Sequence, residues 1–390
     1  MRKIGTSAFG IRAPIIKEGD SIVDIVVQSV LDSNIELKDN DVIGLTESIV
    51  ARSQGNYVST DDIAKEVCEI FKSESVGVVF PILSRNRFSI ILRGIAKSNK
   101  KIYIQLSYPA DEVGNHLMDI DQMDKFEINP YTDVFEEKKY REIFGNNVSH
   151  PFTGVDYVKL YKEIINNDKV EIIFSNNPTT ILDYTKEVIA ADIHTNKRTM
   201  RLLERAGADK VISLKNLCSS NNSNGFNPDY GLLGSNKAGE ERLKLFPRDC
   251  NTIVRDIQQR IFEKTGKKVE VMVYGDGAFK DPVGKIWELA DPVVSPGFTD
   301  GLMGTPNEIK IKYIADTKLS DLKGKELDDA MREQILKKDD NLVGKGDALG
   351  TTPRQLTDLL GSLCDLMSGS GDKGTPIILI QGYFDNYATN

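Results

Sequence analysis

The apolar positions near the N-terminus predict a helix followed by a strand. Four apolar residues recur at helical spacing just after a turn: Ile22, Ile25, Val26 and Val30. The apolar run at residues 42–45 then reads as a strand, and it delivers Thr46, Glu47 and Ser48 at its C-terminal end. Because loops at strand ends commonly carry ligand-binding groups, this end of the strand is a candidate site.

Two further blocks with clear patterns lie in the C-terminal third. A helical stripe of Ile253, Ile257 and Ile261 precedes an alternating strand, 269–273, which runs into Asp276 between two glycines. The last block is a helix with Thr352 as its N-cap and Pro353 at its first position, and it carries Leu356, Leu359, Leu360, Leu363 and Met367 on one face. It ends in a glycine-rich loop, 368–374, and residues 376–380 form the strand that follows.

The middle of the chain has a different organisation. Residues 170–174 and 210–214 read as strands, and the stretch 179–206 between them reads as mostly helical. This order predicts a small βαβ unit, inserted between the other blocks. The polar segment 219–227 is expected to be an exposed loop that returns to the main body.

Composition and charge exclude several classes of protein. The chain has 390 residues with 50 basic and 58 acidic side chains, and its net charge of −8 would repel nucleic acid and anionic lipid. No apolar run approaches the roughly 20 residues of a membrane span, and the first ten residues lack the apolar core of a signal peptide. We therefore expect a cytoplasmic protein with no nucleic-acid or membrane partner. Four scattered cysteines and three histidines leave oxygen ligands as the main means of holding a metal.

The glycine-rich loop SGSGDKG matches the pattern GxGxxG only formally. A dinucleotide-binding loop follows a strand and opens a helix, whereas this loop leaves a helix and enters a strand. Consecutive glycines still allow backbone N–H groups to cradle a phosphate, with Lys373 or a metal supplying charge. A plain flexible connector is the alternative, because Gly and Ser dominate ordinary turns.

Carboxylates at predicted strand ends form a second candidate constellation. Asp111 and Glu112 follow the strand at 102–106, with Asn115 close behind, and Asp276 ends the later strand. Magnesium and manganese prefer one or two carboxylates together with substrate phosphates, so the two strand-end acids could converge on such an ion. The alternative is that each acid caps a helix or a turn.

Four segments of the chain, taken in order, resemble the coenzyme F420 γ-glutamyl ligases. They are GIRAPIIKEGDSI with DNDVIGLTESIVARSQGN, then YPADEVGN, then TGKKVEVMVYGDG, and finally LCDLMSGSGDKGTPIILIQG. The resemblance covers roughly residues 1–120 and 245–390, although the spacing from Asp111 to Asn115 is one residue longer than in the family pattern. It implies an α+β fold of mixed β-sheets with packed helices, in which residues 1–115 and 245–390 form a ligase-like core and residues 116–244 an inserted small α/β lobe.

The resemblance also implies a reaction and a site. GTP would phosphorylate a carboxylate acceptor, and the amine of L-glutamate would then attack the acyl phosphate. Asp111 and Asp276 would bind Mg²⁺ or Mn²⁺, and Glu112 is our candidate proton acceptor. Arg52 would lie near the phosphates, where the family commonly has lysine, and is a second candidate catalytic residue. The remaining residues implied to contact nucleotide are Gly10, Ile11, Ser48, Asn115, Gly277, Leu366, Met367, Ser368, Gly369, Ser370, Gly371, Asp372, Lys373 and Gly374.

The sequence leaves alternatives for the acceptor and for the function. The acceptor could be a deazaflavin precursor, a folate or another carboxylate, because substrate identity lies in loops rather than in the core. The family suggests a homodimer. A non-catalytic sensor or scaffold that binds nucleotide without turnover is the alternative function. A dehydrogenase is disfavoured, because residues 175–178 after the strand at 170–174 contain no glycine.

Overall fold

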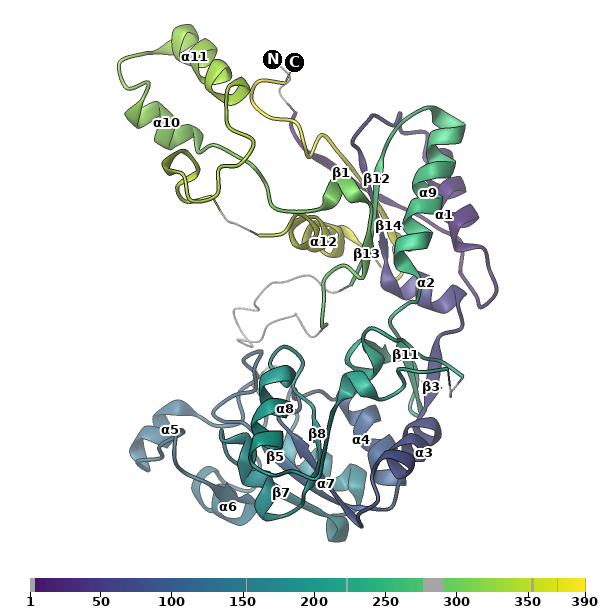
Figure 1. Ribbon diagram of the computed structural model, residues 1–390, viewed down its shortest axis with the longest axis vertical. Coiled ribbons are helices and arrows are strands. Elements are labelled where there is room, and N and C mark those ends of the chain that lie inside the picture. Colours follow the sequence, from purple (N-terminus) through teal and green to yellow (C-terminus); the bar gives the residue numbers. More distant parts are fainter. Residues whose placement is uncertain are drawn as a thin grey trace.

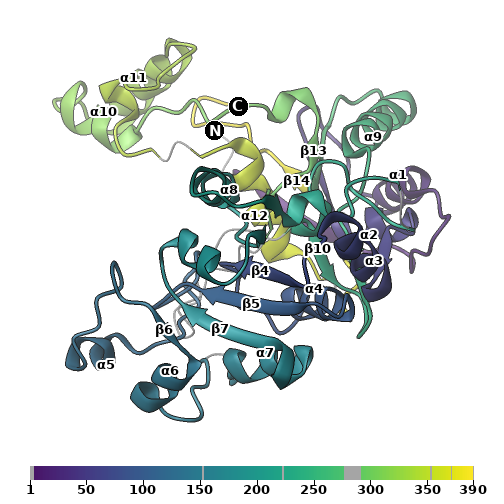
Figure 2. The ribbon, with the colours of Figure 1, turned by 60° about the horizontal axis from the view of Figure 1, so that its bottom comes forward.

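The computed structural model describes residues 4–151, 153–221, 224–275, 291–351, 354–369 and 371–389. These residues form two lobes, each built on its own large sheet, and a small helical extension (Figure 1). The described ends of the chain lie close together at the edge of the upper lobe in both ribbon views (Figures 1 and 2). Mixed sheets packed with helices confirm the predicted α+β class.

A five-stranded mixed sheet forms the core of the upper lobe. Its strands, in spatial order, are β1 (Ser7–Ile11), β14 (Ile377–Gln381), β2 (Val42–Thr46), β12 (Glu270–Tyr274) and β13 (Gly297–Phe298). Strands β2 and β12 are parallel, and the other neighbouring pairs are antiparallel. Because β14 comes from the C-terminus, this sheet joins the two ends of the chain.

Helices cover both faces of this sheet. Helices α1 (Ile22–Asp32) and α9 (Cys250–Thr265) share one hydrophobic cluster with β1, β2, β12 and β14, and α12 (Leu356–Met367) packs on the opposite face. Gly44 allows α12 to approach β2 closely, because a Cβ at this position would lie 2.4 Å from the Sγ of Cys364. The predicted helical and strand blocks of the upper lobe are thus confirmed, although α12 begins at Leu356 with Gln355 as its N-cap, later than predicted. The predicted cap Thr352 and first residue Pro353 lie outside the described residues.

A six-stranded sheet forms the core of the lower lobe. Its spatial order is β6 (Phe135–Glu136), β7 (Val170–Phe174), β5 (Lys101–Leu106), β4 (Ser75–Val79), β8 (Glu187–Ala190) and β9 (Lys210–Ser213). All neighbours are parallel except β6 and β7. The chain moves outward from β4 through β5 to β7, and then returns to the other side of β4 for β8 and β9, which is a doubly wound arrangement.

The remaining elements surround this lower sheet or connect it to the upper lobe. One face carries α3 (Thr60–Ile70), α4 (Arg87–Lys97) and α7 (Tyr157–Ile165), and the other carries α8 (Asn196–Arg205). Helices α5 (Ile120–Lys125) and α6 (Glu137–Phe144) lie near β6 (Figure 2). A three-stranded sheet of β10 (Ser235–Lys237), β11 (Arg242–Leu245) and β3 (Tyr57–Ser59) lies between the lobes, next to α2 (Glu47–Ser53).

The structure corrects the interpretation of the middle segment. The stretch 179–206 contains strand β8 as well as α8, and β7 and β9 are separated by three other strands rather than forming one βαβ unit. Strand β8 is buried along its whole length, so it shows no alternation, and a short apolar run of this kind cannot be distinguished from a buried helix by periodicity.

Strand pairing also crosses the predicted boundary at residue 116. Strands β4 and β5, assigned above to the ligase-like core, pair with β8 and β7 in the lower sheet. The α/β lobe therefore starts before residue 75 rather than at residue 116. The predicted exposed loop 219–227 is buried at its end, where the Asn227 side chain donates to the carbonyls of Phe246 and Pro247 at 3.0 and 3.1 Å.

The helical extension lies away from both large sheets (Figure 2). It consists of α10 (Ile311–Thr317) and α11 (Gly324–Leu336), which bury Ile314, Met331 and Ile335 against each other. Within the described ranges, no helix is long and apolar enough to cross a membrane.

Candidate functional site

One edge of the five-stranded sheet collects most of the residues predicted to bind nucleotide. The ends of β1, β2 and β12 meet the start of β14 there, since Ile11 is paired with Ile377 and Thr46 with Tyr274. Two backbone hydrogen bonds hold the adjacent segments together: Ala13 N donates to Gly374 O at 3.3 Å, and Thr46 N donates to Pro376 O at 3.1 Å. Gly10, Ile11, the glycine-rich loop and the start of α2 are therefore neighbours in space.

The glycine-rich loop leaves α12 and turns back into β14. Gly369 and Thr375 form an isolated antiparallel bridge that closes the turn, and Gly374 adopts a positive φ of 63°. Asp372 and Lys373 at the tip are exposed, as is Leu366 at the end of the helix. Ser370 lies outside the described residues.

A cationic cavity of about 550 Å³ lies beside this edge. It is bounded by the loop before α1, helix α2 and the three-stranded sheet. Its lining residues are Lys17, Glu18, Ser48, Arg52, Tyr57, Lys237, Ala238, Arg242 and Lys244. Five of these nine side chains are cationic and one is anionic, in a chain whose net charge is −8. Such a concentration of positive charge in a concave site attracts polyanions such as phosphates.

The cations of the cavity differ in how they are held. Lys237 donates to Glu240 at 2.6 Å, and the Arg242 guanidinium lies 4.5 Å from the centre of the Tyr57 ring. The structure gives the exposed Arg52 side chain no hydrogen bond or ion pair within the part of the chain that it describes. Arg52 is therefore available to a ligand.

A buried carboxylate, Glu47, lies behind the cavity wall. Glu47 directly precedes Ser48 in the sequence. Its Oε1 accepts hydrogen bonds from Lys244 Nζ at 3.0 Å and from Asn236 Nδ2 at 3.2 Å. The residue is 4% exposed, and Oε2 has no hydrogen-bond partner among the described residues. Burial raises the pKa of Glu47, the Lys244 ammonium lowers it, and the nearby Asp291 carboxylate raises it further.

The structure places Asp111, Glu112 and Asn115 elsewhere, at the carboxyl end of β5 in the lower lobe (Figure 1). Asp111 accepts four hydrogen bonds, from the backbone N–H groups of Leu83, Val113 and Asn115 and from the Asn115 side chain, at 2.7–3.1 Å. Both carboxylate oxygens are thus occupied by neutral donors. Asp111 thus joins the loop after β5 to the loop after β4, and neither Asp111 nor Asn115 lines the cationic cavity.

Glu112, our sequence-based candidate for the proton acceptor, is also occupied. Its carboxylate accepts hydrogen bonds from Ile193 N, from His194 N at 3.2 Å and from Thr195 Oγ1 at 3.1 Å. These donors lie between β8 and α8, so Glu112 fastens the loop after β5 to the loop after β8. Its catalytic role stays a prediction, although its carboxylate is already engaged by these three donors.

The described residues do not form a metal site. No group of three His, Cys, Asp or Glu side chains within the described ranges is close enough to hold a metal ion. Asp111 does not fit a metal ligand, because four N–H donors already surround its oxygens. Asp276 and Gly277 lie outside the described residues, directly after the end of β12.

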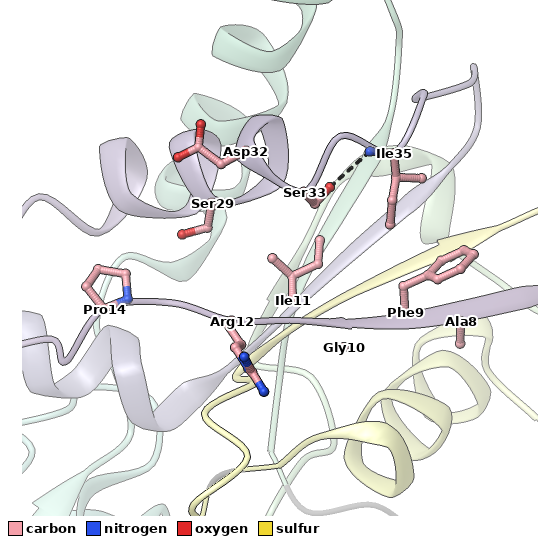
Figure 3. Close-up of a pocket in the computed structure, with 10 residues that line it drawn as sticks. All are labelled: Ala8, Phe9, Gly10, Ile11, Arg12, Pro14, Ser29, Asp32, Ser33 and Ile35. Carbon is pink, nitrogen blue, oxygen red and sulfur yellow. Dashed lines mark hydrogen bonds between the residues drawn. The ribbon is translucent and has the colours of Figure 1, made fainter.

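A second cavity, of about 660 Å³, lies along β1 (Figure 3). Strand β1 is an edge strand of its sheet, and the cavity runs between it and the end of α1. Ile11 and Arg12 point to opposite sides of the strand, with Ile11 toward α1 (Figure 3). The alternation of a strand therefore directs the exposed Arg12 away from the α1 side.

Sequence reasoning missed four of the five cations of the cavity, namely Lys17, Lys237, Arg242 and Lys244. Only Arg242 and Lys244 left a signal, because their spacing of two places both side chains on one face of a strand. Nothing in the sequence indicated that this strand would pair with β3 beside α2.

No curated protein matches the chain in a sequence comparison. A family model described as F420-0:γ-glutamyl ligase matches residues 10–382, which is nearly the whole chain and includes both lobes. The match includes the end of β1, the cationic cavity, the glycine-rich loop and the α/β lobe. The chain therefore belongs to the F420-0:γ-glutamyl ligase family.

Proposed function

We propose that this ligase uses a nucleoside triphosphate, GTP in the first instance, to activate a carboxylate acceptor as an acyl phosphate that L-glutamate then converts into an amide. The observation that carries the proposal is the cationic cavity lined by Ser48 and Arg52, beside the sheet edge where Ala13 and Thr46 are hydrogen-bonded to Gly374 and Pro376. Five cationic side chains beside a loop that can adopt phosphate-cradling backbone geometry suit a triphosphate.

Phosphoryl transfer needs little covalent help from a protein. The nucleotide phosphates must be held in line with the acceptor carboxylate, and the charge that develops on the transferred group must be neutralised. In this proposal Arg52 contributes a planar, permanently charged guanidinium, which can bind two phosphate oxygens at once. Lys17 and Lys237, which also line the cavity, contribute point charges.

A divalent ion, Mg²⁺ or Mn²⁺, remains part of the proposal through Asp276 alone. The ion would neutralise phosphate charge. Asp111 is not a suitable second ligand, and we derive no step that passes through the metal. Formation of a homodimer is likewise proposed, and light scattering during size-exclusion chromatography tests it.

The experiment that tests the function combines the purified chain with GTP or ATP, Mn²⁺ or Mg²⁺, L-glutamate and candidate acceptors. F420-0, the compound in the family's description, is the first acceptor to use, and a folate and a simple carboxylate follow. The expected result is release of inorganic phosphate together with an acceptor whose mass has increased by one glutamyl unit. Parallel reactions without metal and without L-glutamate show whether each of them is required. Nucleotide binding without phosphate release for every acceptor would instead support the sensor or scaffold.

A further inference from the structure

Glu47 has three properties that nucleotide binding in the cavity does not explain. It is buried, it is ionisable, and Oε2 has no donor among the described residues, while Oε1 has two. Buried carboxylate oxygens normally have a hydrogen-bond donor, because an unpaired one loses its hydration without compensation. Oε2 of Glu47 therefore has room for one hydrogen bond, which an N–H group of a bound substrate can donate.

The position of Glu47 identifies that donor. Glu47 is the first residue of α2, directly after β2, and its neighbour Ser48 and its partner Lys244 both line the cationic cavity. A substrate whose anionic groups occupy the cavity would bring a cationic group close to Glu47. Among the groups of the proposed reaction, only the ammonium of L-glutamate has both the charge and the N–H donors that Oε2 lacks.

We propose that Glu47 binds the ammonium group of L-glutamate through Oε2 and accepts the proton that must leave before the nitrogen can attack. This inference rests on the proposed function, because it concerns the second half of the same reaction. It transfers the role of proton acceptor from Glu112, whose oxygens are both engaged in the lower lobe, to a carboxylate beside the cavity.

The ammonium of glutamate gives one proton to Glu47, and its freed electron pair attacks the carbonyl carbon of the acyl phosphate. The new C–N bond forms, the bond between that carbon and the phosphate oxygen breaks, and the phosphate departs with the electron pair. The nitrogen loses its second proton to the departing phosphate, and Glu47 later releases its proton to solvent.

Charged and titratable groups around Glu47 set the pH range of this role. Lys244 on β11 faces Oε1, Asp291 lies near the end of β12 and is paired with Arg87 of α4, and the Cys250 thiol of α9 is close enough for the Glu47 charge to raise its pKa. Burial and Asp291 raise the pKa of Glu47, and Lys244 opposes them. Glu47 therefore accepts a proton only above its raised pKa, and activity falls as Glu47 becomes protonated at lower pH.

The test compares two nucleophiles in Glu47→Gln and in the wild-type enzyme, with F420-0 as acceptor. Hydroxylamine is already unprotonated at neutral pH and traps an acyl phosphate as a hydroxamate without needing a base, whereas glutamate arrives as an ammonium ion. We expect Glu47→Gln to form hydroxamate at a rate close to that of wild type, and to form the glutamyl amide about 10²- to 10⁴-fold more slowly at neutral pH, which is the usual range for a lost general base. Glu187→Gln is the matched control, since Glu187 is a buried glutamate of the lower sheet, and its ratio of amide to hydroxamate should equal that of wild type.

The dependence on pH provides a second readout, which is also measurable on the wild-type enzyme alone. With Glu47 as acceptor, the rate of amide formation is level across neutral pH. Without an acceptor, the rate of amide formation rises about tenfold per pH unit, in step with the fraction of free amine, so raising the pH should partly rescue Glu47→Gln.

Two results would overturn the inference. An equal loss of amide and hydroxamate in Glu47→Gln would mean that Glu47 only positions Lys244. A tenfold rise in the rate of amide formation per pH unit in the wild-type enzyme would exclude any such acceptor. Absence of hydroxamate from the wild-type enzyme would instead refute the proposed function itself.

Discussion

Arg52 is an exposed cation of the cavity that is available to bind phosphate, because no other group within the described structure competes for its guanidinium. Replacing it with alanine should raise the KM for the nucleotide about 10- to 100-fold, since a charge-assisted hydrogen bond contributes roughly 1.5–3 kcal/mol. Arg52→Lys should recover only part of this, because the ammonium keeps the charge but cannot bind two oxygens in one plane. Steady-state kinetics with varied nucleotide measure both effects.

The control for this prediction is Arg255→Ala on α9. Arg255 pairs with Asp300 at 3.3 Å on an exposed surface, outside the cavity. Loss of this arginine should leave the nucleotide KM unchanged. Equal KM values for Arg52→Ala and Arg255→Ala would contradict the assignment of the cavity to the phosphates.

Asp192 in the lower lobe is a buried acid whose environment opposes ionisation. Burial raises its pKa from 3.8 to about 6, the hydroxyls of Thr195 and Thr199 lower it, and the Glu112 charge raises it; Oδ1 has no hydrogen-bond partner among the described residues. Between these two pKa values the unfolded chain ionises Asp192 while the folded chain does not, so stability falls as the pH rises from about 4 to 6 and stays lower above that.

Asp192→Asn should therefore stabilise the protein at neutral pH by roughly 2–3 kcal/mol and change little near pH 4, because a shift of one pKa unit corresponds to about 1.4 kcal/mol. The asparagine keeps one oxygen for the two threonine hydroxyls and places an uncharged amide at the other position. Urea unfolding at both pH values measures the difference. The same gain at both pH values would show that ionisation of Asp192 is not the cause.

At the scale of elements, Glu112 acts as a tether between two loops. Its three donors come from the segment that joins β8 to α8, so Glu112→Ala leaves the backbone N–H groups of Ile193 and His194 without this acceptor. We expect a loss of about 1–2 kcal/mol of stability, since each unsatisfied donor has a cost, with kcat for amide formation within about twofold of wild type. Denaturant unfolding and kinetics on the same preparation separate these effects.

Glu69→Ala on α3 is the control for this tether. Glu69 is exposed and only 4.0 Å from Lys65 one helical turn away, a pair that contributes little. A fall in kcat of Glu112→Ala comparable to that expected for Glu47→Gln would return Glu112 to the catalytic role.

The elements differ in how far the sequence could predict them. Helix α1 was readable because Ile22, Val26 and Val30 mark one buried face, and because Ser21 caps its first turn. Strand β8 was not readable, since all four of its residues are buried and carry no period. The same limit applies to partners: Asp111 follows a strand as predicted, but which loop its carboxylate would meet depends on β4 lying beside β5, and that is a property of the sheet.

The residues of the candidate site also differ in how far the sequence could predict them. Gly10, Ser48, Arg52 and the glycine-rich loop could be found because they occur in recognisable segments that follow the order of the family. Lys244 and Glu47 form an ion pair across 197 residues, and no local pattern predicts such a contact. Long-range pairs of this kind depend on the three-stranded sheet, which places β11 next to α2.

At the scale of the whole molecule, one buried ion pair connects the two lobes. Arg87 of α4 in the lower lobe lies 3.4 Å from Asp291, just before β13 of the upper lobe, and both side chains are at least 91% buried. Arg87 also donates to the backbone carbonyls of Leu233 and Ser235 at 3.2 and 3.5 Å. A single guanidinium thus holds the lower lobe, the start of β10 and the upper lobe in one arrangement around the cavity.

Arg87→Met should destabilise the protein by about 3–5 kcal/mol, because it breaks a buried ion pair by removing one of its partners. Combining it with Asp291→Leu should recover part of this loss, since the buried carboxylate is then removed together with the guanidinium. Arg93→Met, on the same helix, removes solvent-accessible ion pairs with Glu240 and Glu241 and a hydrogen bond to the Glu240 carbonyl, and should cost about 1 kcal/mol or less. Urea unfolding gives the stabilities, and limited proteolysis reports whether the lobes separate before either one unfolds. If Arg87→Met is no less stable than Arg93→Met, the lobes are held together by contacts other than this ion pair.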